Sequence, residues 1–325
     1  MTARHKESAV EHEESTRKGG NADGSSKYTG GGYMNPVAGR KVFFLSHDPQ
    51  TKQIVAGLRA KEFEAYAIAD YRDGKNLLRQ YPGSVCIINI DRQMQQSMWR
   101  AFASSINRDR KLSDTILGVL SVSFTEENVT KLFEGVKLDA GITVLGRASK
   151  LEDAVEKYAQ ILDKFGAKGR RQYVRALCAN DKNARLYWID GKMFIHQMKV
   201  LDISVAAAAV SVPATLAGKL KAPQSLPSAT LLLGRYQHVI YPTVLMTKEA
   251  NGKEIAVLMF AGGLDEETTA SIRSYVFTGL YEQTMMAING LPKDSENYHE
   301  LEEQNKLVKS MESSVQPEKP KNAEP

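Results

Sequence analysis

The stretch Arg170-Arg171-Gln172-Tyr173-Val174-Arg175 places two arginines four positions apart, and Asp202-Ile203-Ser204 follows later in the chain. An arginine presents a planar fork of donors that matches phosphate oxygens or the O6/N7 edge of guanine. An aspartate can accept hydrogen bonds from guanine N1–H and N2–H₂, and a serine can donate or accept. Arg171 and Arg175 point to the same side whether the segment is helical or extended. The two stretches therefore predict a site for a ligand that carries phosphates and guanine bases.

The sequence after this site has the pattern of short strands and tight turns that is typical of an antiparallel β-structure. The Asp190-Gly191 and Asn251-Gly252 pairs indicate two-residue hairpin turns. Predicted strands cover residues 185–189, 192–196, 231–233, 239–246 and 255–260. A helix begins near Asp265 and places Ile272, Tyr275, Val276, Leu280 and Gln283 along one stripe. We expect an antiparallel β-barrel followed by a C-terminal helix.

These motifs resemble the PilZ family, which carries RxxxR and then [DN]xSxxG and binds the bacterial second messenger cyclic di-GMP. The resemblance covers about residues 170–289 and implies a six-stranded barrel with a C-terminal helix. By this resemblance, Arg171 and Arg175 would clamp the phosphates and a guanine Hoogsteen edge, and Arg170 would add to the clamp. Asp202 and Ser204 would surround a guanine. The ligand could bind as a monomer or as an intercalated dimer.

One position of the second motif differs from the family pattern. Ala207 stands where the motif has its closing glycine. Glycine there would permit a positive φ or a close approach of the ligand. Alanine disfavours a positive φ by about 1 kcal/mol. We expect the alanine to weaken ligand binding or to abolish it.

The sequence before the arginine stretch alternates between β-rich and helical segments. Predicted strands cover residues 41–46, 65–68, 84–90, 115–122 and 142–145. Predicted helices cover residues 50–61, 74–80 and 151–165, and Thr125 opens a further one. Strands that alternate with helices indicate a parallel sheet with helices on both faces.

The same region resembles a response-regulator receiver domain, with Asp91 after the third strand at the place of the phosphoacceptor. A receiver uses acidic residues after its first strand to hold Mg²⁺, and here Ser46 and His47 occupy those positions beside Asp48. Arg147 stands where the family has a lysine. We therefore expect a degenerate receiver-like domain that serves for dimerisation or for contact with the barrel.

The bulk composition fits a globular protein of two domains with tails. The 325 residues are 42% hydrophobic and 25% charged, and the net charge of +5 does not indicate nucleic acid. We expect a disordered tail over 1–39, the receiver-like domain over 40–165, the PilZ-like barrel over 166–290, and a charged, mostly disordered tail over 291–325.

Cys86 and Cys178 are expected to be buried and reduced. No catalytic motif, metal-ligand spacing, secretory signal or membrane span is evident.

The sequence predicts a non-catalytic, cytoplasmic sensor that binds cyclic di-GMP and no other cofactor. Ligand binding would rearrange the two domains and relay the second-messenger level to an unidentified protein partner. Two alternatives remain open: a degenerate PilZ scaffold that binds no nucleotide and acts through protein–protein contacts, and a regulator driven by phosphorylation of Asp91. The sequence also leaves open whether the chain forms a homodimer.

Overall fold

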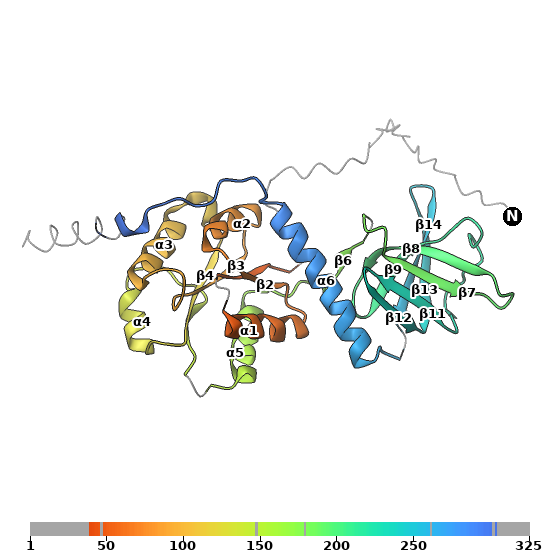
Figure 1. The fold of residues 1–325 in the computed structure, drawn as a ribbon, viewed down its shortest axis with the longest axis horizontal. Helices are drawn as coiled ribbons and strands as arrows, with labels where there is room; N and C mark the ends of the chain where they lie inside the picture. The colour runs from red at the N-terminus through yellow and green to blue at the C-terminus, as the bar shows by residue number, and fades with distance from the viewer. Residues whose placement is uncertain are drawn as a thin grey trace, which may run out of the picture. The chain divides into compact units, whose positions relative to one another are not determined.

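The computed structural model describes residues 39–45, 48–146, 149–178, 180–260, 262–300 and 303. They contain two β-sheets, one parallel with five strands and one antiparallel with nine (Figure 1). The described residues all belong to a single unit that runs from Gly32 to Pro325. The N-terminal tail predicted over 1–39 lies outside the described residues, apart from its last position.

The parallel sheet has the order β2-β1-β3-β4-β5. Its strands are β1 (Val42–Leu45), β2 (Ala65–Ile68), β3 (Val85–Asn89), β4 (Ile116–Ser121) and β5 (Gly141–Val144). All five residues of the central strand β3 are buried, as expected when helices cover both faces of a parallel sheet. The predicted parallel α/β architecture is confirmed. Flavodoxin-like folds of several functions share this strand order, so it does not single out a receiver domain.

Helices cover both faces of this sheet (Figure 1). They are α1 (Pro49–Ala60), α2 (Gly74–Gln80), α3 (Gln96–Arg108), α4 (Glu126–Leu132) and α5 (Leu151–Lys164), with 3-10 turns at Tyr71–Asp73 and Arg110–Leu112. Phe43 shares a hydrophobic core with α2, α3 and α4. Its neighbour Phe44 shares a core with α1 and α5, because successive strand residues point to opposite faces.

Helix α3 is missing from the elements that the sequence analysis predicts. Its core residues Trp99, Phe102 and Ile106 recur at helical spacing, so an apolar period is present. The usual start signal is absent, because the N-cap residue Gln95 makes no side-chain capping bond. The helix forms because tertiary packing buries Trp99 and Phe102 completely.

The antiparallel sheet has the order β10-β13-β14-β9-β8-β7-β11-β12, and β6 pairs with β8 beside this path. Its strands are β6 (Ala176–Leu177), β7 (Arg185–Ile189), β8 (Ile195–Ile203), β9 (Ala207–Ser211), β10 (Gln224–Ser225), β11 (Ala229–Leu233), β12 (Tyr236–Ile240), β13 (Pro242–Ala250) and β14 (Lys253–Phe260). The sheet curls around an apolar core (Figure 1). Over the described residues, the end strands β10 and β12 do not pair with each other. The expected barrel is therefore a half-barrel.

Of the two predicted hairpin turns, one is confirmed and the other is wrong. Asn251 and Gly252 both have positive φ, of 52° and 68°, and join β13 to β14 as a two-residue turn. The two-residue turn predicted at Asp190-Gly191 is wrong, because the loop continues to Phe194. The Asp190 carboxylate accepts hydrogen bonds from the Lys192 and Phe194 amides and stabilises this longer loop.

The single strand predicted over 239–246 is also wrong. The chain leaves β12 at Ile240 and enters β13 at Pro242. Proline has no amide hydrogen, so it interrupts the hydrogen-bond ladder and is suited to the first position of a strand.

The last helix, α6 (Glu266–Met286), contributes to the cores of both sheets. It begins where predicted, because the Asp265 carboxylate accepts a hydrogen bond of 2.7 Å from the Thr268 amide. Ile272 and Val276 lie in the core of the antiparallel sheet. Tyr281, and Ile288 just beyond the helix, contact the core of the parallel sheet.

The segment after α6 packs on the parallel-sheet region, although it belongs to the range 291–325 that is expected to be mostly disordered. Tyr298 is only 1% exposed and lies beside Phe102, with ring centroids 5.5 Å apart. The Asp294 amide donates to the Arg72 carbonyl, and Lys293 forms an ion pair with Asp70 at 2.7 Å. Aromatic burial and ion pairs therefore hold residues 292–298 in place, and the extent of the mostly disordered tail expected over 291–325 stays a prediction.

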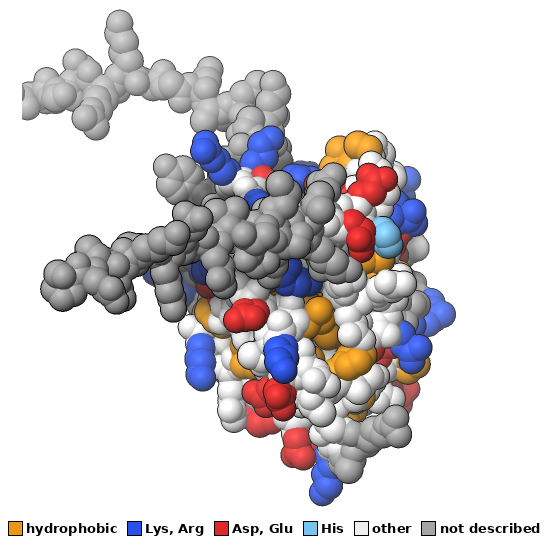
Figure 2. All heavy atoms as spheres, turned by 90° about the vertical axis from the view of Figure 1, so that its left-hand side faces the viewer, with side chains coloured by type: hydrophobic (Ala, Val, Ile, Leu, Met, Phe, Trp, Pro, Cys, Tyr) orange, Lys and Arg blue, Asp and Glu red, His pale blue; other side chains and the backbone are white. Residues whose placement is uncertain are grey.

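The part of the surface that is shown in Figure 2 carries mixed charges. On the face shown in Figure 2, acidic and basic side chains are interspersed with apolar ones. None of the helices in the described ranges has both the length and the apolar character needed to cross a bilayer. Within the same ranges, no group of three His, Cys, Asp or Glu side chains is placed to hold a metal ion.

Candidate nucleotide site

The two predicted motifs meet through a short strand pair. In the antiparallel pairing of β6 with β8, Leu177 stands opposite Asp202 and Ala176 opposite Ile203. Arg175 directly precedes β6, and its Nη1 lies 3.5 Å from Asp202 Oδ1. The structure thus brings the second motif arginine and the motif aspartate into contact.

Asp202 has unused capacity to accept hydrogen bonds. It lies at an irregularity of the β8–β9 ladder, where the register shifts between Val200 and Asp202. Its side chain is 27% exposed, and its buried Oδ1 has no hydrogen-bond partner among the described residues. The ion pair with Arg175 is longer than a hydrogen bond, so this oxygen keeps its capacity to accept one, but a ligand could reach the buried atom only after the side chain turns outward.

Ser204 shapes the turn between β8 and β9. It is 1% exposed, and its Oγ accepts hydrogen bonds from the Ala206 and Ala207 amides at 3.4 and 3.3 Å. Its own amide donates to the Ala207 carbonyl at 2.9 Å. In this structure Ser204 fixes the backbone beside Asp202, and its predicted contact with a guanine stays a prediction.

Ala207 begins strand β9 in an ordinary extended conformation and pairs with Met259 of β14. The non-glycine residues with positive φ in the described ranges are Glu62, Gln93, Met193 and Asn251, so Ala207 is not among them. Of the two reasons for a glycine at this position, a positive φ therefore does not apply to this structure, and the close approach of a ligand stays a prediction. Because the ladder with β14 holds the backbone extended, alanine introduces no strain here.

The arginine segment itself is irregular and exposed. Arg171 and Arg175 line one hollow of about 70 Å³, and Glu62 and Glu64 line the same hollow. Arg170 is exposed and is not among the lining residues. The two predicted phosphate ligands therefore share one surface, and acidic side chains of the parallel-sheet region lie next to them.

Glu62 is a neighbour of this segment that the sequence analysis does not identify. Its Oε2 accepts a hydrogen bond of 3.0 Å from the Val174 amide, and its Oε1 accepts one of 3.0 Å from Arg273 Nη2 on α6. No local pattern marks Glu62, because its partners are remote in sequence. The segment before the arginines is also fixed: the Ala167 carbonyl accepts from the Arg40 amide, and the Lys168 ammonium lies 4.5 Å from the Phe63 ring centroid.

Asp91, the predicted phosphoacceptor, is held by the end of β4. Its Oδ1 accepts from Ser121 Oγ at 2.9 Å, and its Oδ2 accepts from the Val122 amide at 2.6 Å. Asp48 caps α1 by accepting from the Gln50 and Thr51 amides. Both carboxylates therefore stabilise the fold, and phosphorylation of Asp91 stays a prediction. Ser46, His47 and Arg147 lie outside the described residues.

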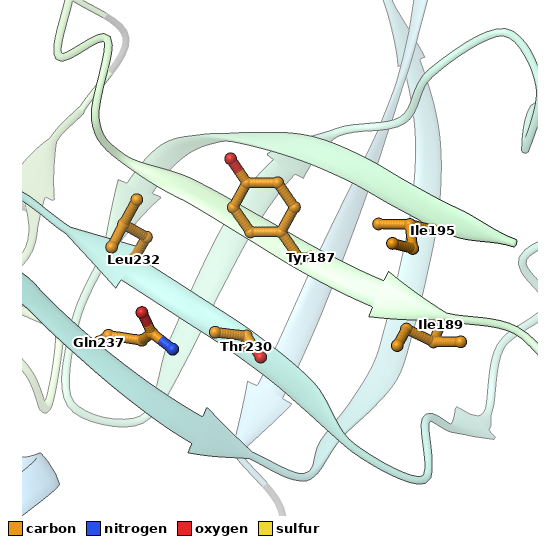
Figure 3. Close-up of a pocket in the computed structure, with 6 residues that line it drawn as sticks. All are labelled: Tyr187, Ile189, Ile195, Thr230, Leu232 and Gln237. Atoms are coloured by element: carbon orange, nitrogen blue, oxygen red, sulfur yellow. The ribbon is translucent and has the colours of Figure 1, made fainter. Parts of the chain in front are cut away.

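A second hollow, of about 290 Å³, lies on the outer face of the antiparallel sheet (Figure 3). Its lining residues come from β7, β8, β11 and β12 and are Tyr187, Ile189, Ile195, Thr230, Leu232 and Gln237. Tyr187 alternates with the buried Leu186 and Trp188 and so faces outward. The unbroken apolar run 231–233 is the sequence signal for this apolar outer face.

No protein-family model matches the chain, and no curated protein matches it. Among solved structures, the chain is similar to the PilZ domain of YcgR from Escherichia coli with c-di-GMP. That match has 11% identity and a TM-score of 0.33, and covers 37% of this chain and 98% of that one. The chain is also similar to the inhibitor of motility MotI from Bacillus subtilis, at 17% identity and a TM-score of 0.30. A third similar structure is the MrkH–c-di-GMP complex of K. pneumoniae, at 14% identity and a TM-score of 0.29.

The MotI match covers 36% of this chain and 53% of that one, and the MrkH match covers 37% and 55%. The chain therefore spans about half the length of these two proteins. Over about 37% of its length, the chain is similar to a solved PilZ domain, the family that its arginine and aspartate motifs resemble.

Proposed function

We propose that residues 166–290 form a PilZ-like domain that binds cyclic di-GMP. Arg171 and Arg175 would bind the phosphates and a guanine Hoogsteen edge, and Asp202 would accept from a guanine. The observation that carries this proposal is the 3.5 Å contact between Arg175 and Asp202. This contact supports the proposal, because a side chain that can donate to phosphate lies next to one that can accept from guanine N1–H and N2–H₂.

The polar chemistry of this site suits a charged dinucleotide. Within the described part of the chain, the buried Asp202 Oδ1 has no hydrogen-bond partner, and a guanine could satisfy it once the side chain turns outward. Ser204 holds the turn that follows Asp202 through bonds to the Ala206 and Ala207 amides. A hydrogen bond to a charged group contributes about 1.5–3 kcal/mol. Two arginines with base contacts would support micromolar affinity, or about −8 kcal/mol.

We further propose that the bound ligand changes the contact between the arginine segment and the parallel-sheet region, and that a protein partner reads this change. Residues 170–175 join the fixed segment at Ala167 to strand β6. A ligand that binds Arg171 and Arg175 would therefore change the positions of both the segment at Ala167 and strand β6. The ligand can shift such an equilibrium only by its difference in affinity for the two arrangements.

Calorimetric titration of the full chain with cyclic di-GMP tests the proposal. Wild type should release or absorb heat with a micromolar dissociation constant, and the double variant Arg171→Ala/Arg175→Ala should show none. The matched control is Lys248→Ala/Lys253→Ala, which removes two positive charges from exposed positions on β13 and β14. It should bind like wild type. An absence of heat for wild type at ligand concentrations well above about 10 µM would contradict the proposal.

A further inference from the structure

Residues 170–175 are held at both ends and once in the middle. Before them, the Arg40 amide donates to the Ala167 carbonyl at 3.0 Å. After them, β6 pairs with β8. Between these anchors, the Val174 amide donates to Glu62 Oε2 at 3.0 Å. Val174 lies between the two motif arginines, so this bond fixes the part of the segment that presents Arg171 and Arg175.

The backbone conformation and the contacts of Glu62 fix its carboxylate beside the Val174 amide. It follows α1 with a φ of 64°, a left-handed conformation that is uncommon for a residue other than glycine. Its side chain is 11% exposed, and Arg273 binds its Oε1 through Nη2 at 3.0 Å and Nε at 3.3 Å. One carboxylate therefore connects the parallel-sheet region, the arginine segment and helix α6.

The hollow beside the arginines is too small for a dinucleotide while Glu62 holds the segment. Its volume is about 70 Å³, whereas small-molecule sites usually have about 300–1,000 Å³. Glu62 and Glu64 line it together with Arg171 and Arg175. Lys168 lines it as well. A phosphate that enters here would lie beside both carboxylates, and these like-charge contacts would offset part of its attraction to the three cations.

We propose that Glu62 acts as a latch, which holds residues 170–175 against the parallel-sheet region. The anionic dinucleotide must displace Glu62 from this segment in order to bind. This inference rests on the proposed binding of cyclic di-GMP by Arg171 and Arg175. The latched form does not bind the ligand, so the apparent affinity falls by the fraction of molecules that are unlatched. Release of Val174 from Glu62 is then the first structural consequence of binding.

The test compares cyclic di-GMP affinities of the full-length variants Glu62→Gly, Glu62→Gln and Glu156→Gln by calorimetry. Glycine removes the carboxylate and suits the positive φ, so the turn after α1 should fold. Glutamine keeps an oxygen acceptor for the Val174 amide but loses the charge. The control Glu156→Gln removes the same charge from an exposed ion pair with Lys61.

Glu62→Gly should bind cyclic di-GMP about tenfold or more tightly than wild type, Glu62→Gln should lie between them, and Glu156→Gln should match wild type. Binding by Glu62→Gly but not by wild type would support the latch, and it would contradict the micromolar affinity proposed for wild type. If wild type binds and Glu62→Gly binds equally or more weakly, the latch is overturned and the ligand proposal survives. If neither binds, both proposals fail.

Hydrogen exchange of the ligand-free proteins adds a readout that needs no nucleotide. The Val174 amide should exchange slowly in wild type and in Glu156→Gln, and faster in Glu62→Gly, because its carboxylate acceptor is gone. Equal exchange at Val174 in wild type and Glu62→Gly would overturn the latch whatever the affinities are.

Discussion

Arg175 Nη1 lies 3.5 Å from Asp202 Oδ1, although the two residues belong to separate parts of the sequence. The pairing of Leu177 with Asp202 across β6 and β8 creates this contact. Without ligand, the aspartate and the arginine compensate each other's charge. A ligand with phosphates and guanine bases could replace this contact with bonds to both side chains.

The extended backbone at Ala207 predicts that a motif glycine would bring no benefit. We expect Ala207→Gly to lower the free energy of unfolding by about 0.5–1 kcal/mol, because glycine loses more conformational entropy in a strand. The dissociation constant for cyclic di-GMP should not change. Urea unfolding and calorimetry measure the two quantities.

The matched control for this substitution is Ala209→Gly, since Ala207 and Ala209 lie on the same strand and are each 9% exposed. Ala209→Gly should lower the free energy of unfolding by a similar amount. Tighter nucleotide binding by Ala207→Gly, but not by Ala209→Gly, would show that the Ala207 methyl group obstructs the ligand.

Burial of Tyr298 predicts that residues 292–298 contribute to stability. Loss of a buried aromatic side chain typically costs about 3–5 kcal/mol. Tyr298→Ala should therefore lower the free energy of unfolding strongly in urea titrations, whereas His299→Ala, at an exposed position, should not. Unchanged stability of Tyr298→Ala would mean that the segment is as disordered as its composition suggests.

The cysteines should be inert near neutral pH. Both are free and buried, and burial raises the pKa of Cys178 to about 11 and that of Cys86 further. Because the thiolate is the nucleophile, neither should react with Ellman's reagent at about pH 8 unless denaturant is added.

The raised pKa of Cys178 also predicts how stability depends on pH. A group with a raised pKa stabilises the fold fully below its unfolded pKa, here 9.0, and loses this contribution as the pH rises towards 11. Cys178→Ser should weaken this alkaline loss in unfolding curves recorded between these values. Rapid labelling of native Cys178 at neutral pH would contradict the burial that the structure shows.

Much of the fold follows from local sequence signals. The apolar run around β3, the Asn251-Gly252 turn and the Asp265 cap each determine their structure over a few residues, so the sequence predicts them. Strand β6 has only two residues and exists because β8 offers it a partner. No periodicity can reveal so short an element.

The candidate site was predicted in part. The motif spacing identifies Arg171, Arg175 and Asp202, and the structure brings Arg175 to Asp202. Glu62 was not predicted, because its contacts with Val174 and Arg273 depend on how remote segments fold together. The extended conformation of Ala207 could not be predicted for the same reason, since its pairing with β14 determines it.

The most direct test of the nucleotide site is a double-mutant cycle on the cyclic di-GMP dissociation constant. It compares wild type, Arg175→Ala, Asp202→Ala and the double variant by calorimetry. If both side chains bind one ligand, their effects should be coupled by about 0.5–3 kcal/mol. Effects that add within about 0.5 kcal/mol, or wild type that binds no cyclic di-GMP, would contradict a shared site.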